Sequence, residues 1–421
     1  METKHDYDVI VIGGGASGMM AAGRCAEMGK KVLLIEKNKE LGEKLKITGG
    51  GRCNITNAEY DARVLLKNYG LAEQFLYSPF AQFGIKETFR FFEKRGLPLI
   101  VEAGKRAFPQ TEKALDVFRV LEKYLKNTNV TIKTNSPVTK ILKSTSPKRG
   151  NKSKITGVEM GKKTYTANSY ILSTGGTSHP ETGSTGDGFN WLGDLGHTVK
   201  SPTPTVVPLA VKEGWIKSLP GITVPFMKIT FYVDGIKKFS KTGKLLFTHF
   251  GLSGPLILNS AAKVSDLLHT GVVTAKIDLF PDLDESELDK KIVKIFDDNK
   301  NKIFKNVLSE IVPKGTADAI LTLLKDIDGD IKVHSIFKEE RKILVNTLKA
   351  LPATILSLMG ADRAVVTDGG VDLKEIDMKT MKSKMIDNLF VIGDLLHMDH
   401  KSGGYSLQIC WTTGYIAGSN A

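Results

Sequence analysis

The sequence of 421 residues is poor in cysteine and has no long hydrophobic run. Its three cysteines, Cys25, Cys53 and Cys410, lie far apart, and no Cys-x-x-Cys pair occurs. This spacing excludes a dithiol relay of the usual kind and argues against a disulfide framework. No apolar stretch approaches the ~20 residues that a membrane-spanning helix needs, so no membrane partner is expected. The first strand is expected near residue 7, which leaves no room for a signal peptide and predicts a cytoplasmic location.

Internal repeats, low-complexity segments and metal-ligating clusters are also missing, so no metal site is expected. Hydrophobic residues make up 41% and charged residues 25%, as in ordinary soluble globular proteins. The net charge of +13 would suit an anionic partner. However, the lysines are dispersed along the sequence and form no basic stripe interleaved with aromatic residues, which disfavours nucleic-acid binding. The length allows two or three domains.

The sequence does contain a glycine-rich turn between an expected strand and an expected helix. Residues 7–12 are typical of a buried strand, residues 19–26 of a helix and residues 32–35 of a second buried strand. Between the first strand and the helix lies a Gly-x-Gly-x-x-Gly motif, Gly13 to Gly18, and Glu36 follows 18 residues later. Strand, turn, helix, strand and acid in this order predict a dinucleotide-binding site.

Each part of the motif has a physical role. Gly13 permits the tight turn, Gly15 lets a pyrophosphate approach the backbone, and Gly18 lets the helix lie close to the strand. The N-terminus of the helix offers unpaired N–H groups and a positive dipole end to phosphates. Glu36 is expected to accept hydrogen bonds from a ribose diol.

The segment 40–57 contains three consecutive glycines, 49–51, which cost backbone entropy unless the chain passes close to a ligand. Arg52 is expected to face a phosphate or a flavin carbonyl, and Asn54 the edge of the ring. Cys53 has two open interpretations: a thiol that reacts with a flavin, or a small packing residue.

Two later segments also end in glycine. A strand over 169–174 leads into Gly175, and a strand over 388–392 leads into Gly393 and Asp394, whose carboxylate can reach a ribityl hydroxyl. After Gly403 and Gly404 a helix is expected through residue 417. Its open N-terminus would stabilise negative charge on a reduced flavin. A backbone contact from Val138 to an adenine and a plain sheet position remain alternatives.

Composition divides the chain into four parts. We expect an α/β fold with a Rossmann-type FAD-binding domain built from both chain ends, residues 1–200 and 356–421. A β-rich domain over 201–283 and a helical lobe over 284–355 are inserted between them. An Asp234-Gly235 hairpin marks the β-rich part. His249, in a glycine-bounded stretch of that part, is a candidate wall of the active site.

The separated glycine-bearing segments favour FAD over NAD, because a long cofactor must be held from several chain regions. The sequence resembles the bacterial FAD-binding family that includes aminoacetone oxidase and flavin-dependent reductases of 3-oxo bile-acid intermediates. The resemblance lies in residues 13–18, 41–44, 49–54, 182–188, 247–255, 375–384 and 403–414.

This resemblance implies FAD contacts that extend the motif glycines Gly13, Gly18 and Gly51. The implied contacts are Gly15, Ala16, Ser17, Glu36, Lys37, Lys44, Arg52, Cys53, Asn54, Val138, Thr174, Gly175, Gly393, Asp394, Gly404, Tyr405, Leu407 and Gln408. Relatives usually have Glu at position 394 and Asn at position 406, where this chain has Asp394 and Ser406. The first change shortens a carboxylate, and the second puts a side-chain contact at 406 in doubt.

The combination predicts a flavoenzyme that moves a hydride between flavin N5 and a small organic substrate. No second Gly-x-Gly-x-x-Gly follows a strand, so NAD(P)H would act only as a transient electron donor. Amine oxidation with O2 and NAD(P)H-driven reduction of a conjugated enone both remain open. The enone route needs a proton donor, for which Tyr405, His249 and His397 are candidates. A third hypothesis is a flavin-containing RNA-binding or tRNA-modifying protein.

Overall fold

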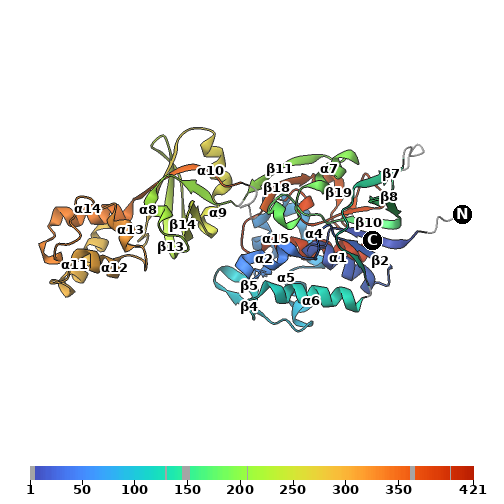
Figure 1. Ribbon diagram of the computed structural model, residues 1–421, viewed down its shortest axis with the longest axis horizontal. Helices are drawn as coiled ribbons and strands as arrows, with labels where there is room; N and C mark the ends of the chain where they lie inside the picture. Colours follow the sequence, from blue (N-terminus) through green and yellow to red (C-terminus); the bar gives the residue numbers. More distant parts are fainter. Residues whose placement is uncertain (1–4, 129, 145–151, 206, 361–365, 399) are drawn as a thin grey trace. The chain divides into compact units, whose positions relative to one another are not determined.

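The computed structural model describes residues 5–128, 130–144, 152–205, 207–360, 366–398 and 400–421. The chain forms two compact units, Met1–Pro204 with Val365–Ala421, and Thr205–Ala364 (Figure 1). The second unit extends beyond residue 355 because strand β17, Leu351–Leu358, pairs with two strands of that unit. No helix among the described residues is long and apolar enough to cross a membrane.

The first unit is organised around a seven-stranded sheet in the order β19-β20-β21-β10-β1-β2-β6. The strands from β21 to β6 run parallel, as expected for a doubly wound α/β fold. This arrangement confirms the expected Rossmann-type fold. The strands are β1 (Tyr7–Ile12), β2 (Val32–Ile35), β6 (Thr131–Lys133), β10 (Ala167–Leu172), β19 (Ile376–Asp377), β20 (Lys382–Ser383) and β21 (Leu389–Val391).

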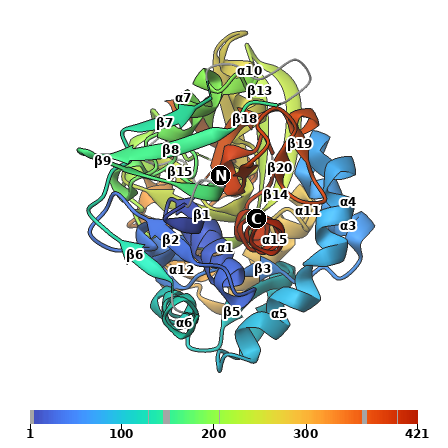
Figure 2. The same ribbon diagram turned by 90° about the vertical axis from the view of Figure 1, so that its right-hand side faces the viewer.

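Helix α1, Ala16–Glu27, packs against both α6, Ala114–Asn127, and α15, Tyr405–Asn420 (Figure 2). A Cβ on Gly414 would lie 2.6 Å from the Ser17 carbonyl oxygen, and one on Gly418 would lie 2.6 Å from the Ala21 carbonyl oxygen. These glycines let α15 lie directly on α1 and run parallel to it. The first and last helices of the chain thereby form one layer.

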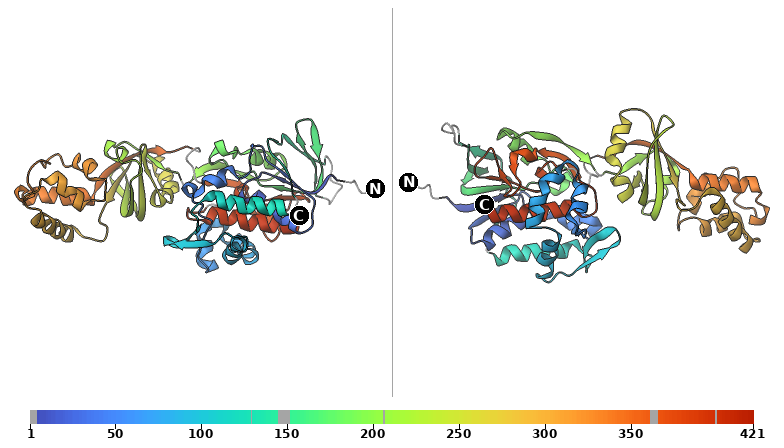
Figure 3. Two further views of the ribbon diagram at one scale, coloured as in Figure 1. Left: turned by 60° about the horizontal axis from the view of Figure 1, so that its bottom comes forward. Right: turned by 180° about the vertical axis from the view of Figure 1, so that it is seen from behind.

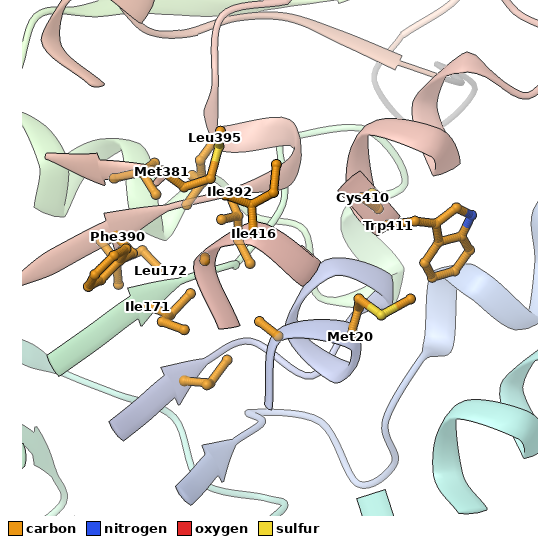
Figure 4. Packing of buried hydrophobic residues seen from close by; sticks show 14 of the residues in the cluster. Met20, Ile171, Leu172, Met381, Phe390, Ile392, Leu395, Cys410, Trp411 and Ile416 are labelled. Carbon is orange, nitrogen blue, oxygen red and sulfur yellow. The ribbon is translucent and has the colours of Figure 1, made fainter. Parts of the chain in front are cut away.

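Figure 4 shows the core that these elements share. Met20 of α1 and Trp411 of α15 belong to one hydrophobic cluster, and Ile171 of β10 is paired with Phe390 of the neighbouring strand β21. All four side chains are almost fully buried. The Trp411 indole donates a 2.9 Å hydrogen bond to the Ile55 carbonyl, which fixes the glycine-rich segment to α15.

Smaller elements complete the first unit. The remaining helices are α2 (Glu43–Ile47), α3 (Ala62–Leu66), α4 (Glu73–Gln82), α5 (Ile85–Glu93) and α7 (Asp187–Asp194). The remaining strands are β3 (Thr56–Asn57), β4 (Leu99–Glu102) and β5 (Arg106–Pro109) in one sheet, β7 (Lys140–Lys143), β8 (Ile155–Met160) and β9 (Lys163–Tyr165) in another, and the pair β11 (Val199–Thr205) and β18 (Val366–Val371).

The second unit is a closed barrel with helices attached. The strand order is β12-β15-β14-β13-β16-β17, with β12 (Leu209–Val211), β13 (Thr223–Val233), β14 (Ile236–Thr248), β15 (Gly251–Ser253) and β16 (Val273–Asp278). Asp234 and Gly235 both have positive φ, 48° and 81°, so the expected hairpin turn is confirmed.

The helices of the second unit share its core. Those next to the barrel are α8 (Gly214–Lys217), α9 (Pro255–Leu258) and α10 (Ala261–Leu268), and the lobe, orange in Figure 3, contains α11 (Glu285–Asp298), α12 (Phe304–Ile311), α13 (Ala317–Leu321) and α14 (Lys338–Lys349). One continuous hydrophobic cluster includes Phe231 of the barrel and Leu288 and Leu344 of the lobe. The inserted strands and helices therefore form one compact body.

Candidate functional site

The N-terminus of α1 is open. Gly13 turns the chain at φ 104°, and Gly15 precedes the helix without any side-chain cap. A Cβ on Gly15 would meet no atom within 4 Å, whereas one on Gly18 would lie 1.9 Å from the Gly13 carbonyl oxygen. The helix start is therefore free to receive a phosphate, while the helix itself is pressed against the turn.

A cavity lies beside this helix start, at the carboxyl ends of β1, β2 and β10. It is lined by Ile12, Gly13, Ile35, Glu36, Lys37, Ser136, Pro137, Val138, Thr174, Gly183, Asp187 and Trp191. The structure thus brings together five of the expected contacts, Gly13, Glu36, Lys37, Val138 and Thr174. The Thr174 hydroxyl is buried and has no hydrogen-bond partner among the described residues. Such an orphaned hydroxyl suits a polar ligand.

The Glu36 carboxylate is held in place by two backbone N–H groups. Its two carboxylate oxygens accept N–H bonds of 2.8 Å from Gly14 and from Asn38, which leaves further lone pairs on both oxygens. Lys37 is engaged differently, because its ammonium group donates to Thr185 and forms a 2.8 Å ion pair with Asp187. Lys37 therefore ties the loop before α7 to the cavity wall. Trp191 also lines the cavity, but nothing in the sequence had marked it as a site residue.

A second group of expected contacts meets at the first turn of α1. A Cβ on Gly393 would lie 2.7 Å from the Ser17 hydroxyl oxygen, and the Gly393 N–H donates to the Thr413 hydroxyl at 3.1 Å. Lys44 donates to Ser178, a residue absent from our expected contacts, at 3.1 Å. Burial lowers the pKa of Lys44, and the charge of Asp394 opposes this effect. A buried ammonium at this point suits a phosphate or another anionic group.

The N-terminus of α15 is open as well. Gly404 precedes it at φ 99° without a side-chain cap. A Cβ at this position would lie 2.3 Å from the Thr56 carbonyl carbon, so the helix start is pressed against β3. Tyr405 begins the helix, and its carbonyl accepts a 3.0 Å hydrogen bond from the Tyr69 hydroxyl. Since α15 runs parallel to α1 but begins earlier along the shared axis, the two helix starts are suited to the two ends of a long cofactor.

The glycine-rich segment has the expected irregular backbone, with φ of 60°, 68° and 85° at Gly49, Gly50 and Gly51. The side chain of Arg52 is held by protein groups. Its terminal nitrogen pairs with Glu102 and Glu112, and its guanidinium stacks 4.3 Å from the Phe108 ring centroid. The buried Nε of Arg52 and the buried Oδ1 of Asn54 lack a hydrogen-bond partner among the described residues.

Cys53 is fully buried, and burial raises the pKa of its thiol to about 12. The thiol is therefore protonated and poorly nucleophilic at neutral pH. We expect acid denaturation to release all the flavin into the supernatant and to leave the precipitated protein colourless. Flavin that stays attached after denaturation, and that a Cys53→Ser variant releases, would contradict this expectation.

The side chain of Gln408 is likewise held by protein groups. Its side-chain oxygen accepts hydrogen bonds from Thr56 at 2.6 Å and Thr88 at 3.0 Å, and its amide nitrogen donates to Thr412 at 3.0 Å. The side chain is almost fully buried and joins β3, α5 and α15, and the expected cofactor contact of Gln408 stays a prediction. Leu407 is partly buried against the core, and Gly175 turns at φ 75° beside Ser184.

The three candidate proton donors lie in different environments. Tyr405 lies at the start of α15, and burial raises the pKa of its phenol, so that it stays protonated. His397 lies 3.2 Å from both Asp368 and Lys200, in an ion-pair network of β11 and β18. His249 is exposed on the turn between β14 and β15 of the second unit, where its ring contacts Phe250.

A serine, a histidine and a glutamate lie in line elsewhere in the first unit. The His197 ring nitrogens lie 2.8 Å from Glu375 and 3.0 Å from Ser383. The side chain of His197 is completely buried, Ser383 is 2% exposed, and the Ser383 oxygen also accepts two backbone N–H bonds. This arrangement holds β19 and β20 against α7 and offers no accessible nucleophile.

Comparison with known proteins agrees with this geometry. The family model for the HI0933-like protein Rossmann domain matches residues 7–420. The 3-dehydro-bile acid delta(4,6)-reductase of Clostridium scindens is 29% identical over 414 residues, which cover 98% of both chains. The ribosomal RNA dihydrouridine synthase of Haemophilus influenzae is 28% identical over 410 residues, which cover 96% of both chains.

Solved structures show the same fold. The 3-ketosteroid-delta4-(5alpha)-dehydrogenase of Rhodococcus jostii RHA1 aligns with a TM-score of 0.52 at 15% identity, over 100% of this chain and 98% of that one. The 3-ketosteroid delta1-dehydrogenase of Sterolibacterium denitrificans gives 0.52 at 14%, over 98% of both chains. With the open helix starts, the cavity and the orphaned polar atoms, these matches confirm the resemblance seen in the sequence. The chain belongs to the HI0933-like Rossmann-domain family and is an FAD-dependent oxidoreductase.

Proposed function

We propose that the protein reduces a carbon–carbon double bond conjugated with a carbonyl group, using electrons from NAD(P)H that pass through FAD. The observation that carries this proposal is the end-to-end similarity to two kinds of reductase. A 3-oxo Δ4,6 steroid and a uracil ring both contain an alkene conjugated with a carbonyl, and each is saturated by one hydride and one proton. This shared chemistry favours reduction over amine oxidation.

Bound FAD would supply hydride transfer, and the chain supplies binding and electrostatics. The start of α1 and Lys44 would hold the phosphates, and Glu36 the ribose. The start of α15, which has no side-chain cap, would stabilise negative charge on the ring. Tyr405, whose burial keeps the phenol protonated, would give its proton to the carbon next to the substrate carbonyl.

Anaerobic mixing tests the reaction class. NADH or NADPH should bleach the yellow flavin absorbance, and a 3-oxo Δ4 steroid should then restore it with formation of the saturated ketone. Aminoacetone should leave the absorbance unchanged. Bleaching by the amine, with none by either nicotinamide, would overturn the proposal in favour of an oxidase.

Replacing Tyr405 with phenylalanine should slow the reoxidation of reduced flavin by the enone by roughly 10²- to 10⁴-fold, since the proton donor is lost. Reduction of the flavin by NAD(P)H should keep its rate, because that step needs no proton from Tyr405. Tyr415→Phe, on the same helix, is the matched control and should leave both rates unchanged. Equal slowing of both steps by Tyr405→Phe would point to a displaced helix and contradict the assignment.

A second candidate substrate is uridine in ribosomal RNA. It is suggested only by the names of two relatives, the ribosomal RNA dihydrouridine synthases of Haemophilus influenzae and of Escherichia coli, the latter 27% identical over 412 residues. Purified rRNA incubated with the protein and NADPH should then contain dihydrouridine by mass spectrometry. Absence of dihydrouridine under conditions that reduce a small enone would exclude this substrate.

A further inference from the structure

Lysines that are dispersed along the sequence gather on one outer face of the barrel in the second unit. On β13, the half-buried Lys228, Thr230 and Tyr232 alternate with fully or almost fully buried residues and therefore point outward. Strand pairing places Lys237 of β14 opposite Tyr232, and Lys276 of β16 opposite Thr230. Lys237 and Lys276 are both exposed. We call Lys228, Tyr232, Lys237 and Lys276 the lysine face.

The positive charge of this face is not neutralised by an ion pair within the part of the chain that the structure describes. None of its three lysines forms an ion pair with a residue that the structure describes. Asp278, the acidic residue opposite Lys228, is bound instead by Lys349 at 2.7 Å. From Thr223 to Thr248 the chain carries five lysines and one acidic residue. The face therefore presents a local excess of unpaired ammonium groups.

Polar and aromatic groups lie between the lysines. The Thr230 and Ser240 hydroxyls, on neighbouring strands, are 2.9 Å apart. The Tyr232 ring centroid lies 5.5 Å from the Lys276 ammonium. Lys228 and Lys276 are diagonal neighbours across two strands, which corresponds to a backbone separation of about 7–8 Å. Spaced cations with hydroxyls and an aromatic ring among them are typical of β-barrel surfaces that bind single-stranded nucleic acid.

We infer that the lysine face binds the phosphate backbone of RNA. This inference rests on the ribosomal RNA form of the proposed function and adds to it the surface that would hold the substrate. An acidic polypeptide would also be attracted by the charge, but it would make less use of the ring and hydroxyl groups. RNA is therefore the partner that the whole set of groups fits best.

The test is fluorescence anisotropy of a labelled single-stranded RNA of mixed sequence with the full-length protein, without NAD(P)H. Lys228→Gln/Lys237→Gln/Lys276→Gln should weaken binding at least about tenfold in 0.1 M salt and lower the slope of log K against log salt by about 2, the value for three lost phosphate contacts. The matched control changes exposed lysines of the helical lobe, Lys290→Gln/Lys294→Gln/Lys325→Gln, and should bind like the unaltered protein.

Three results would overturn the inference: no RNA binding by the unaltered protein, equal losses in both triple variants, or tighter binding of polyglutamate than of RNA. Equal melting temperatures of the two variants would show that both are folded. Because the assay involves no turnover, it is independent of the proposed reaction. If neither an enone nor rRNA is reduced while RNA binding still depends on these lysines, the proposed reaction is wrong. The inference that the lysine face binds RNA is then still supported.

Discussion

Replacing Gly15 with alanine should leave the apoprotein as stable as the unaltered chain and weaken FAD binding. The new methyl group would meet no protein atom within 4 Å, and the φ of −76° at this position is ordinary for alanine. The same space lies directly above the start of α1, where a pyrophosphate would approach the backbone. Overpacking against the cofactor should cost roughly 1–3 kcal/mol, or about 5- to 150-fold in Kd.

The measurement pairs thermal unfolding of the apoprotein with titration of FAD. Gly193→Ala is the matched control, because Gly193 lies in α7 and a Cβ there also meets no atom within 4 Å. That variant should bind FAD normally. Undiminished FAD affinity in Gly15→Ala would show that the pyrophosphate does not lie over this turn, and would contradict the assigned cofactor position.

Gly18→Ala should, in contrast, strongly destabilise the first unit. Its Cβ would lie 1.9 Å from the Gly13 carbonyl oxygen and 2.6 Å from the Ser173 hydroxyl oxygen. The first of these contacts is with the backbone, which no side-chain rotation relieves. Helix α1 would have to move away from β1 and β10 and also lose its contact with α15. We expect a loss of about 3 kcal/mol or more in the free energy of unfolding.

Denaturant unfolding, followed by Trp fluorescence, measures this loss, since Trp411 is buried in the first unit. The variant should also purify without yellow colour. Retention of full stability together with full FAD content would mean that α1 does not lie as close to the turn as described. The contrast between the two variants separates two roles within one motif. Gly15 leaves space for the cofactor, and Gly18 lets helix α1 pack closely against the turn.

Local features were predictable from the sequence because they depend on a few neighbouring residues. Alternating and continuous apolar runs indicated the strands, and positive φ is easily adopted at Gly13 and at the Asp234-Gly235 turn. The dinucleotide motif could be recognised for the same reason. Its strand, turn and helix are contiguous, so their packing follows from a single short stretch.

Roles that depend on distant partners were not predictable in this way. Thr56 and Thr88 bind the side-chain oxygen of Gln408, an expected cofactor contact. Arg52 was expected to face a phosphate or a flavin carbonyl, and Glu102 and Glu112 bind its terminal nitrogen. The partners lie between 50 and 352 residues away in the chain, and nothing in the local sequence of either residue identifies them.

By itself, the sequence determined that both chain ends build one cofactor-binding domain, since its glycine-bearing turns carry that information locally. Only the tertiary structure decided which lysine side chains lie on the same face of the barrel. Lys228, Lys237 and Lys276 belong to three strands, and they share one face because of the register in which those strands pair. Register arises from side-chain packing across the whole barrel, and a shift by one residue would turn each lysine inward. The physical reason is the range of the interactions: turns form between neighbours, whereas a charged surface forms only when distant strands meet.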